Sequence, residues 1–125
     1  NFIETMIQLF EERDNVTVVN DQIMSPTFTA DVAKALCNGI DNDIDPGIYH
    51  IVNSGKASWY ELANYVSSKM GSDCRVLPCN SYQFKTLASR PEYSVLDNSK
   101  IVKFVGNIPN WTNAVDRYLS EKGHF

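Results

Sequence analysis

Hydrophobic residues near the start of the chain recur every three or four positions, with acidic and amide side chains between them. This spacing places the apolar side chains on one helix face, so we predict an amphipathic helix that ends near Asp14. The β-branched run from Val16 to Val19 predicts a short strand, which stops at the turn formers Asn20 and Asp21. The apolar face of the helix consists of Phe2, Ile3, Met6, Ile7 and Phe10.

A loop and a second helix are expected next. The loop is the segment QIMSPT at residues 22–27. Thr29 is a suitable N-cap for the helix, and Asp31 in its first turn is well placed against the helix dipole. After an acidic turn that contains a proline, the apolar run YHIVN at residues 49–53 predicts a buried strand. The buried stripe expected for the helix is Val32, Ala33, Leu36, Cys37 and Ile40.

The clearest helix signal lies at residues 58–71. Ser58 and Glu61 form a capping box, and Gly71 supplies the C-terminal stop. The CRVLPC run at residues 74–79 predicts a strand, in which Pro78 favours an edge position or a strand end because it cannot donate to a ladder. A polar stretch with a short helical turn follows, through Phe84.

Two more helices are expected before a polar tail. Asp97 or Asn98 can cap the first, which ends at Gly106, and Asn110 can cap the second. Helices that alternate with short strands indicate an α/β fold, here about five helices and an incomplete sheet. The length of 125 residues fits a single domain, or a fragment of one, over residues 1–125. A first residue other than Met suggests a cut chain.

Composition narrows the function classes. The formal net charge of −4 disfavours a nucleic-acid binder, whose affinity depends on basic residues. No apolar run is long enough for a membrane helix, and the first residues do not resemble a secretory signal. The cysteines Cys37, Cys74 and Cys79 have neither disulfide nor metal-site spacing, so we expect a cytoplasmic protein without a bound metal.

Several patterns with possible chemistry have simpler explanations. The chain has no GxGxxG and no P-loop, so we do not expect it to bind a dinucleotide alone. Tyr65 and Lys69 spell YxxxK, but Tyr65 falls on an apolar helix stripe and Lys69 near a helix C-terminus, which explains both residues. His50 and His124 have no partner at metal or triad spacing. We therefore predict no catalytic residue and no metal ligand.

Arg90 is the most suggestive single residue. It precedes Pro91, which favours an extended backbone from which a side chain can project. Its guanidinium could bind a diphosphate, or it could pair on the surface with Glu92 or another carboxylate, and the chemistry alone leaves both open. Gln22 and Thr27 could hydrogen-bond a sugar or base, although polar loop residues are often only solvated.

Four blocks of the chain, in order, resemble the second half of dTDP-4-dehydrorhamnose reductases. They are NFIETM, VVNDQIMSPTFTADVA, GIYHIVNSGKASWYELA and RPEYSVLDNSK, and the later PNWTNAVDRYL resembles the terminal helix of that family. The resemblance implies the C-terminal, substrate-binding portion of an extended short-chain dehydrogenase in the Rossmann-like superfamily. The intact enzyme would reduce dTDP-4-dehydro-L-rhamnose to dTDP-L-rhamnose with NADPH or NADH.

The same resemblance implies which residues act. Gln22, Pro26 and Thr27 of the DQxxSPT block and Arg90 of the RP block would contact the dTDP-sugar substrate. The catalytic Tyr and Lys and the Gly-rich loop would lie in an N-terminal Rossmann half that this sequence does not contain. The chain alone would then be inactive. Met24 stands where members commonly have Gly, and it would reshape the loop if that position needed a positive φ.

Two alternatives remain at this point. One is the epimerisation or dehydration of another nucleotide sugar, for which Met24 is the support, because a fold does not fix the chemistry. The other is a non-catalytic regulatory subunit of the same family, as in methionine adenosyltransferase. Without a Rossmann half, the apolar face of the first helix and the YHIVN segment would be exposed, so we expect a homo-oligomer or poor solubility.

Overall fold

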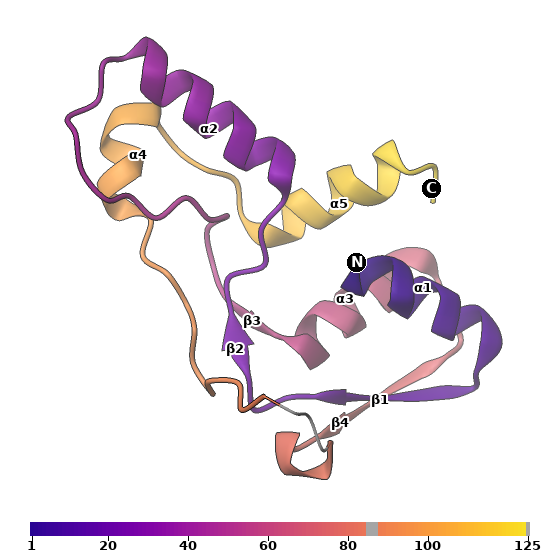
Figure 1. Cartoon of the computed structure of the whole chain (residues 1–125). Coiled ribbons are helices and arrows are strands. Elements are labelled where there is room, and N and C mark those ends of the chain that lie inside the picture. The colour runs from indigo at the N-terminus through magenta and orange to yellow at the C-terminus, as the bar shows by residue number, and fades with distance from the viewer. Residues whose placement is uncertain (85–87, 125) are drawn as a thin grey trace. The chain divides into compact units, whose positions relative to one another are not determined.

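The computed structural model describes residues 1–84 and 88–124. The chain folds into two compact units. The first unit contains Asn1–Met24, Ala57–Ser94 and the C-terminal end from His124, and the second contains Ser25–Lys56 and Val95–Gly123. The described residues form five α-helices and short strands, which confirms the α/β class predicted from the sequence (Figure 1).

The first unit is built on a pair of parallel strands. Strand β1 (Asn15–Val19) pairs in register with β4 (Arg75–Cys79), so that Val16 lies opposite Val76 and Val18 opposite Pro78. Helices α1 (Phe2–Glu12) and α3 (Trp59–Met70) lie along one face of this pair (Figure 1). In the described residues β4 has no second neighbour, which suits a strand that contains a proline.

Helix α1 shows how the first core forms. Asn1 caps it by accepting a hydrogen bond from the Glu4 N–H at 3.1 Å. The expected exposure of its apolar face was wrong, because Met6, Ile7 and Phe10 are buried. The elements that α1 contacts, β1 and α3, also contribute buried residues to this unit, namely Val16, Val18, Leu62, Ala63 and Val66.

Helix α3 confirms its sequence signals. The Ser58 hydroxyl accepts from the Glu61 N–H at 3.1 Å, and the Glu61 carboxylate accepts from the Ser58 N–H at 2.7 Å. The helix ends at Gly71, whose φ of 61° is left-handed and costs glycine little. Strand β3 (Ala57–Ser58), directly before the helix, pairs antiparallel with β2 (Ile23–Met24), and neither of these strands was predicted.

The second unit contains helices α2 (Thr29–Asp41), α4 (Ser99–Val105) and α5 (Trp111–Glu121). Asn110 caps α5 as predicted, and Gly106 ends α4. Asp97 accepts from the Ser99 N–H at 2.8 Å at the start of α4, whereas Asn98 donates to the Val52 carbonyl instead. A cluster of buried apolar residues holds the unit together, namely Ala35, Ile101 and Ile108.

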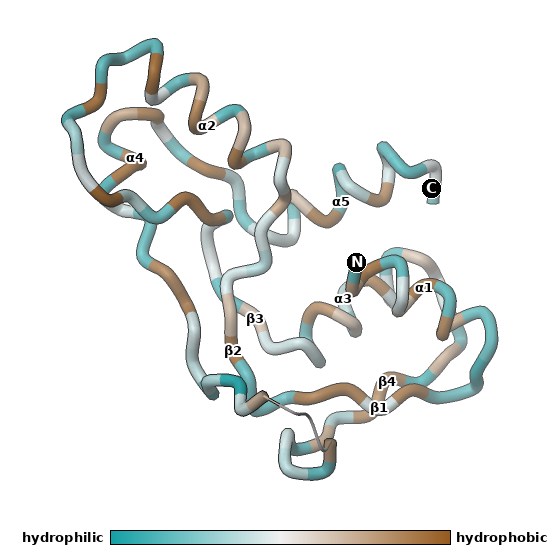
Figure 2. Tube along the Cα trace, in the orientation of Figure 1, coloured by the Kyte–Doolittle hydropathy of each residue, from teal (hydrophilic) through white to brown (hydrophobic). Residues whose placement is uncertain are grey.

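The prediction for α2 was wrong in two respects. Thr29 is its first helical residue and not its N-cap, which is Phe28 without a side-chain bond. The buried positions are Asp31, Ala35 and Gly39, whereas Leu36 and Ile40 are 50% and 76% exposed. Figure 2 shows hydrophobic and polar positions interspersed along this helix. A Cβ at residue 39 would lie 3.2 Å from Ile44 Cδ1, so the helix packs through its smallest side chains.

The YHIVN segment is not a strand in the described structure. Only Val52 and Asn53 are buried, and His50 is exposed, contrary to its predicted burial. Side chains satisfy part of this backbone, because the Asn98 amide donates to the Val52 carbonyl and the Lys100 ammonium donates to the Ile48 carbonyl. Among the described residues, no helix is long and apolar enough to cross a membrane.

Candidate functional site

A pocket of about 660 Å³ lies within the first unit and contains two of the residues singled out from the sequence. Gln22 and Arg90 both line it, although they are far apart along the chain. Its volume is in the range of sites that bind small molecules and cofactors. The other described lining residues are Phe2, Met6, Thr17, Val18, Val19, Trp59, Ser81, Tyr82, Phe84 and Ser89.

Backbone hydrogen bonds at Ile23 explain how Gln22 and Arg90 reach the same pocket. The Ile23 N–H donates to the Glu92 carbonyl at 2.8 Å, and the Ser94 N–H donates to the Ile23 carbonyl at 2.9 Å. These bonds form a parallel bridge between Ile23 and Tyr93. Gln22 lies directly before this bridge and Arg90 lies three residues before Tyr93. The segment QIMSPT was therefore only partly a loop, as its second and third residues form β2.

Met24 does not disturb this arrangement. It lies in β2, opposite Ala57, in extended backbone that any residue can adopt. Among the described non-glycine residues, only Asp43 has a positive φ. The condition under which Met24 would reshape the loop is therefore not met.

Aromatic side chains form much of the pocket wall, and the sequence reasoning missed them. Phe2 and Trp59 pack with ring centroids 4.7 Å apart and planes inclined by 54°. Tyr82 and Phe84 are 77% and 48% exposed. Aromatic faces can stack on a base or pack against a sugar. Two aromatic residues inside the polar stretch around residue 82 were a usable signal, because large exposed aromatics often mark binding surfaces.

Arg90 is exposed, and no ion pair joins it to Glu92 in the described part of the chain. The backbone carbonyl of Glu92, in contrast, accepts a hydrogen bond from the Ile23 N–H. The surface pairing considered from the sequence is therefore absent from residues 1–84 and 88–124. A planar guanidinium beside aromatic rings can bind a phosphate bidentately.

Pro26 and Thr27 belong to the second unit and are not part of the described pocket wall. Pro26 is half-buried and Thr27 is exposed. The Thr27 hydroxyl donates to the Ser25 carbonyl at 2.9 Å. The structure thus brings together two of the four predicted binding residues.

The second unit has a buried polar network around Asp31. The Asp31 carboxylate accepts from the Asn53 amide and the Arg117 guanidinium, each at 2.6 Å. Asn53 also accepts from the Phe28 N–H at 2.8 Å and donates to the Pro109 carbonyl at 3.0 Å. Burial would raise the pKa of Asp31, but the bonds from Arg117 and Asn53 outweigh it and hold the pKa below its usual value. This network explains Asp31 as a structural residue.

The remaining candidates show no catalytic arrangement. Lys69 Nζ lies 5.2 Å from the centre of the Tyr65 ring, on the surface of α3. His124 Nε2 lies 3.4 Å from the Glu4 carboxylate. All three cysteines are free, and burial raises the pKa of the Cys79 thiol, with the charge of Asp21 adding to the effect. Groups of acidic, His or Cys side chains that could hold a metal are absent from the described residues.

Comparison with known proteins gives the family. Residues 1–123 match the RmlD substrate binding domain. The spore coat polysaccharide biosynthesis protein SpsK of Bacillus subtilis (strain 168) is 38% identical over 122 residues, which cover 98% of this chain and 42% of that protein.

Two solved structures are similar over nearly the whole chain. A dTDP-4-dehydrorhamnose reductase ortholog from Clostridium acetobutylicum ATCC 824 has a TM-score of 0.91 at 33% identity, covering 98% of this chain and 44% of that one. The dTDP-4-dehydrorhamnose reductase of Bacillus anthracis str. Ames, in complex with NADP, has a TM-score of 0.88 at 35% identity. The match covers 97% of this chain and 43% of that one. This chain thus spans less than half the length of these relatives. It belongs to the RmlD substrate-binding domain family, together with parts of dTDP-4-dehydrorhamnose reductases.

Proposed function

We propose that this chain is the substrate-binding portion of a reductase that converts dTDP-4-dehydro-L-rhamnose to dTDP-L-rhamnose. The observation that carries the proposal is the shared pocket, in which Arg90 and Gln22 lie beside the rings of Trp59 and Tyr82. A nucleoside diphosphate sugar presents a flat base, two phosphates and a polyhydroxylated ring. Aromatic, cationic and amide groups are the side chains that suit those three parts.

Each residue has a defined part in this proposal. The Arg90 guanidinium binds the diphosphate, and the Gln22 amide donates to or accepts from a sugar or base oxygen. For Thr27 and Pro26 the support is the resemblance alone. The Thr27 hydroxyl already donates to Ser25, so it would accept a hydrogen bond from the substrate through its oxygen.

The proposal assigns hydride transfer to a part of the enzyme outside this sequence. This sequence has no Gly-rich loop to hold a pyrophosphate, so its residues do not fit a dinucleotide. NADPH or NADH would bind a Rossmann half, and the Bacillus anthracis relative in complex with NADP supports the use of such a cofactor by the intact enzyme. The chain alone would be inactive. A cytoplasmic location is consistent with three free cysteines.

Thermal denaturation of the chain tests the proposal with dTDP, dTDP-rhamnose and NADPH added separately. A ligand that binds only the folded state raises the melting temperature. We expect both dTDP ligands to raise it and NADPH to leave it unchanged. Arg90→Ala should abolish the shift, whereas Arg13→Ala, an exposed arginine outside this pocket, should preserve it.

Three outcomes would contradict the proposal. Stabilisation by NADPH alone would mean that the chain holds the cofactor and not the substrate. Equal shifts in Arg90→Ala and in the unaltered chain would remove Arg90 from the site. The absence of any shift would mean that this pocket does not bind dTDP in the isolated chain.

A further inference from the structure

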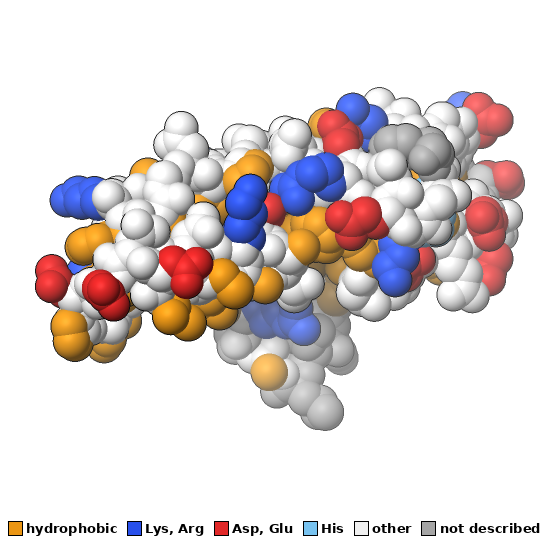
Figure 3. Space-filling view, turned by 90° about the horizontal axis from the view of Figure 1, so that it is seen from above, with side chains coloured by type: hydrophobic (Ala, Val, Ile, Leu, Met, Phe, Trp, Pro, Cys, Tyr) orange, Lys and Arg blue, Asp and Glu red, His pale blue; other side chains and the backbone are white. Residues whose placement is uncertain are grey.

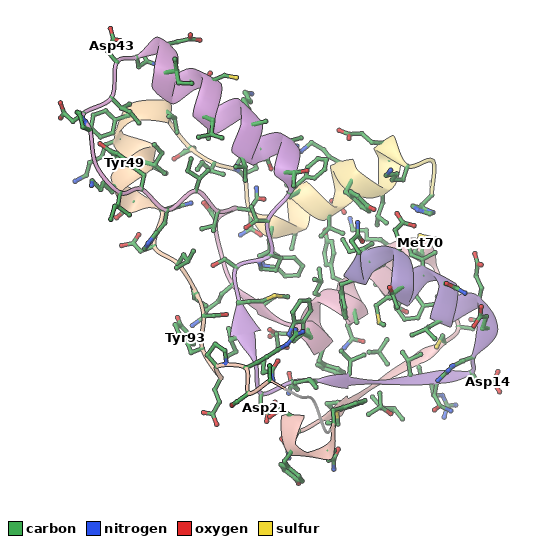
Figure 4. The ribbon with its side chains drawn as sticks, in the orientation of Figure 1. Asp14, Asp21, Asp43, Tyr49, Met70 and Tyr93 are labelled. Carbon is green, nitrogen blue, oxygen red and sulfur yellow. The ribbon has the colours of Figure 1, made fainter. Side chains whose placement is uncertain are left out.

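Asp21 makes a contact that neither the family resemblance nor the pocket itself explains. It lies in the turn between β1 and β2 (Figure 4). Both of its carboxylate oxygens accept from the Ser81 N–H at 3.0 Å, and one also accepts from the Ser81 hydroxyl at 3.0 Å. The two residues are 60 positions apart in the sequence. The contact therefore fixes one distant segment against another.

The segment that Asp21 holds carries part of the pocket wall. Ser81 is the first residue of the short helix η1 (Ser81–Gln83), and Tyr82 and Phe84 line the pocket. Gln22, on the other side of the contact, lines it too. The Asp21 carboxylate thus holds the start of η1, which carries Tyr82, next to the Gln22 amide that is proposed to bind the substrate.

Asp21 satisfies the first backbone N–H of η1 from a distant segment of the chain. Asn80, at the N-cap position of η1, makes no side-chain capping bond. The Ser81 N–H is satisfied from the β1–β2 turn instead, and this bond is the main reason that the pKa of Asp21 lies below its usual value. Asp21 is not among the residues that line the pocket. Its negative charge would also be unfavourable next to a diphosphate, so we expect its effect on binding to pass through Ser81.

We infer that Asp21 is a positioning residue for substrate binding, which acts by holding Ser81 so that Tyr82 and Phe84 face Gln22 and Arg90. The inference rests on the function proposed above. It predicts that loss of the carboxylate weakens ligand binding more than it weakens the fold. It also predicts that another means of fixing the start of η1 can replace Asp21.

Proline at residue 81 provides that other means. Proline suits the first position of a helix, where its fixed φ is already correct. Asn80 has φ −91° and ψ 149°, the extended conformation that a residue before proline prefers. Ser81→Pro also removes the donors that Asp21 binds. A double variant, Asp21→Ala with Ser81→Pro, therefore separates the placement of η1 from the charge of Asp21.

The experiment measures the Kd of dTDP by calorimetry and the melting temperature of the same samples. We expect Asp21→Ala to weaken binding about 5-fold, and Asp21→Asn, which keeps one acceptor oxygen, to weaken it less. Ser81→Pro in the Asp21→Ala background should restore most of the affinity. Asp97→Ala is the matched control, because Asp97 accepts from the Ser99 N–H and hydroxyl in the same manner but lies outside this pocket.

The possible results are distinct. Unchanged affinity in a folded Asp21→Ala variant would overturn the inference alone. If Ser81→Pro alone binds dTDP as the unaltered chain does, weakened binding in Asp21→Ala that Ser81→Pro does not restore would also overturn it, because Asp21 would then act by its charge or through the fold. If the unaltered chain does not bind dTDP, the proposed function fails and this inference fails with it.

Discussion

Asn53 is the residue on which the second unit depends most directly. It is 1% exposed and bonds to Phe28, Asp31 and Pro109, which come from three different segments. Asn53→Ala would leave the Phe28 N–H and the Asp31 carboxylate without this hydrogen-bond partner. We expect a loss of about 2–4 kcal/mol in the free energy of unfolding, measured by urea denaturation. Asn107→Ala, at an exposed position, should change it by less than about 0.5 kcal/mol.

Asp31 makes the stability of the second unit depend on pH. Its pKa in the folded chain lies below the ordinary value of 3.8, so below that value the unfolded state binds more protons than the folded state. The stability from this carboxylate is present above 3.8 and is lost as the pH falls through the folded pKa. Urea denaturation from about pH 5 to about pH 3 should show this loss. Asp31→Asn should reduce the slope, and an unchanged slope would contradict the assignment.

The role of a residue could be predicted from the sequence when its partners lie close to it along the chain. Arg90 and Gln22 were selected by their chemistry and by the family resemblance. Their meeting in one pocket depends on the bridge between Ile23 and Tyr93, in which Ser94 bonds to Ile23, 71 positions away. Short-range patterns do not encode such a bridge. The pairing of Asp21 with Ser81 could not be read from the sequence for the same reason.

At the scale of the element, helix α3 depends on its cap. The Ser58 side chain is buried, accepts from the Glu61 N–H and donates to Asn20 Oδ1 at 2.9 Å. Ser58→Ala should therefore cost about 1–2 kcal/mol in the free energy of unfolding. Ser68→Ala is the control within the same helix, because Ser68 is exposed and alanine favours helix. Equal effects of the two changes would show that the cap is unimportant.

Elements that carry their own signals were predicted well, and those that need a partner were not. The capping box at Ser58 and the stop at Gly71 are local, and both were correct. The YHIVN run has strand composition, but a strand also needs a neighbouring strand, and the described structure gives it none. In α2 the apolar stripe predicted the wrong buried face, because Leu36 and Ile40 are exposed. The helix packs instead through Ala35 and Gly39, because small residues allow a close approach.

At the scale of the whole chain, several apolar side chains remain exposed. They include Leu36 and Ile40 of α2 and Ile48, not the face of α1 that the sequence suggested. On the face shown in Figure 3, hydrophobic side chains reach the surface between charges of both signs. We expect the chain to associate as its concentration rises, because exposed apolar area favours contact. Sedimentation velocity over a range of concentrations measures this.

Ile40→Lys should reduce that association without lowering the melting temperature, since the Ile40 side chain is already solvated. Thr5→Lys, an exposed polar position on another helix, controls for the added charge. A chain that stays monomeric at every concentration would contradict the expectation.

The segment between Ser81 and Tyr93 is fastened near both of its ends. Asp21 holds Ser81, and the backbone of Ile23 holds the residues on either side of Tyr93. Both sets of hydrogen bonds are made by residues 21–23, which follow β1. The pocket residues Tyr82 and Arg90 therefore both depend on the backbone of residues 21–23, so a change in that short stretch would displace both parts of the pocket wall together.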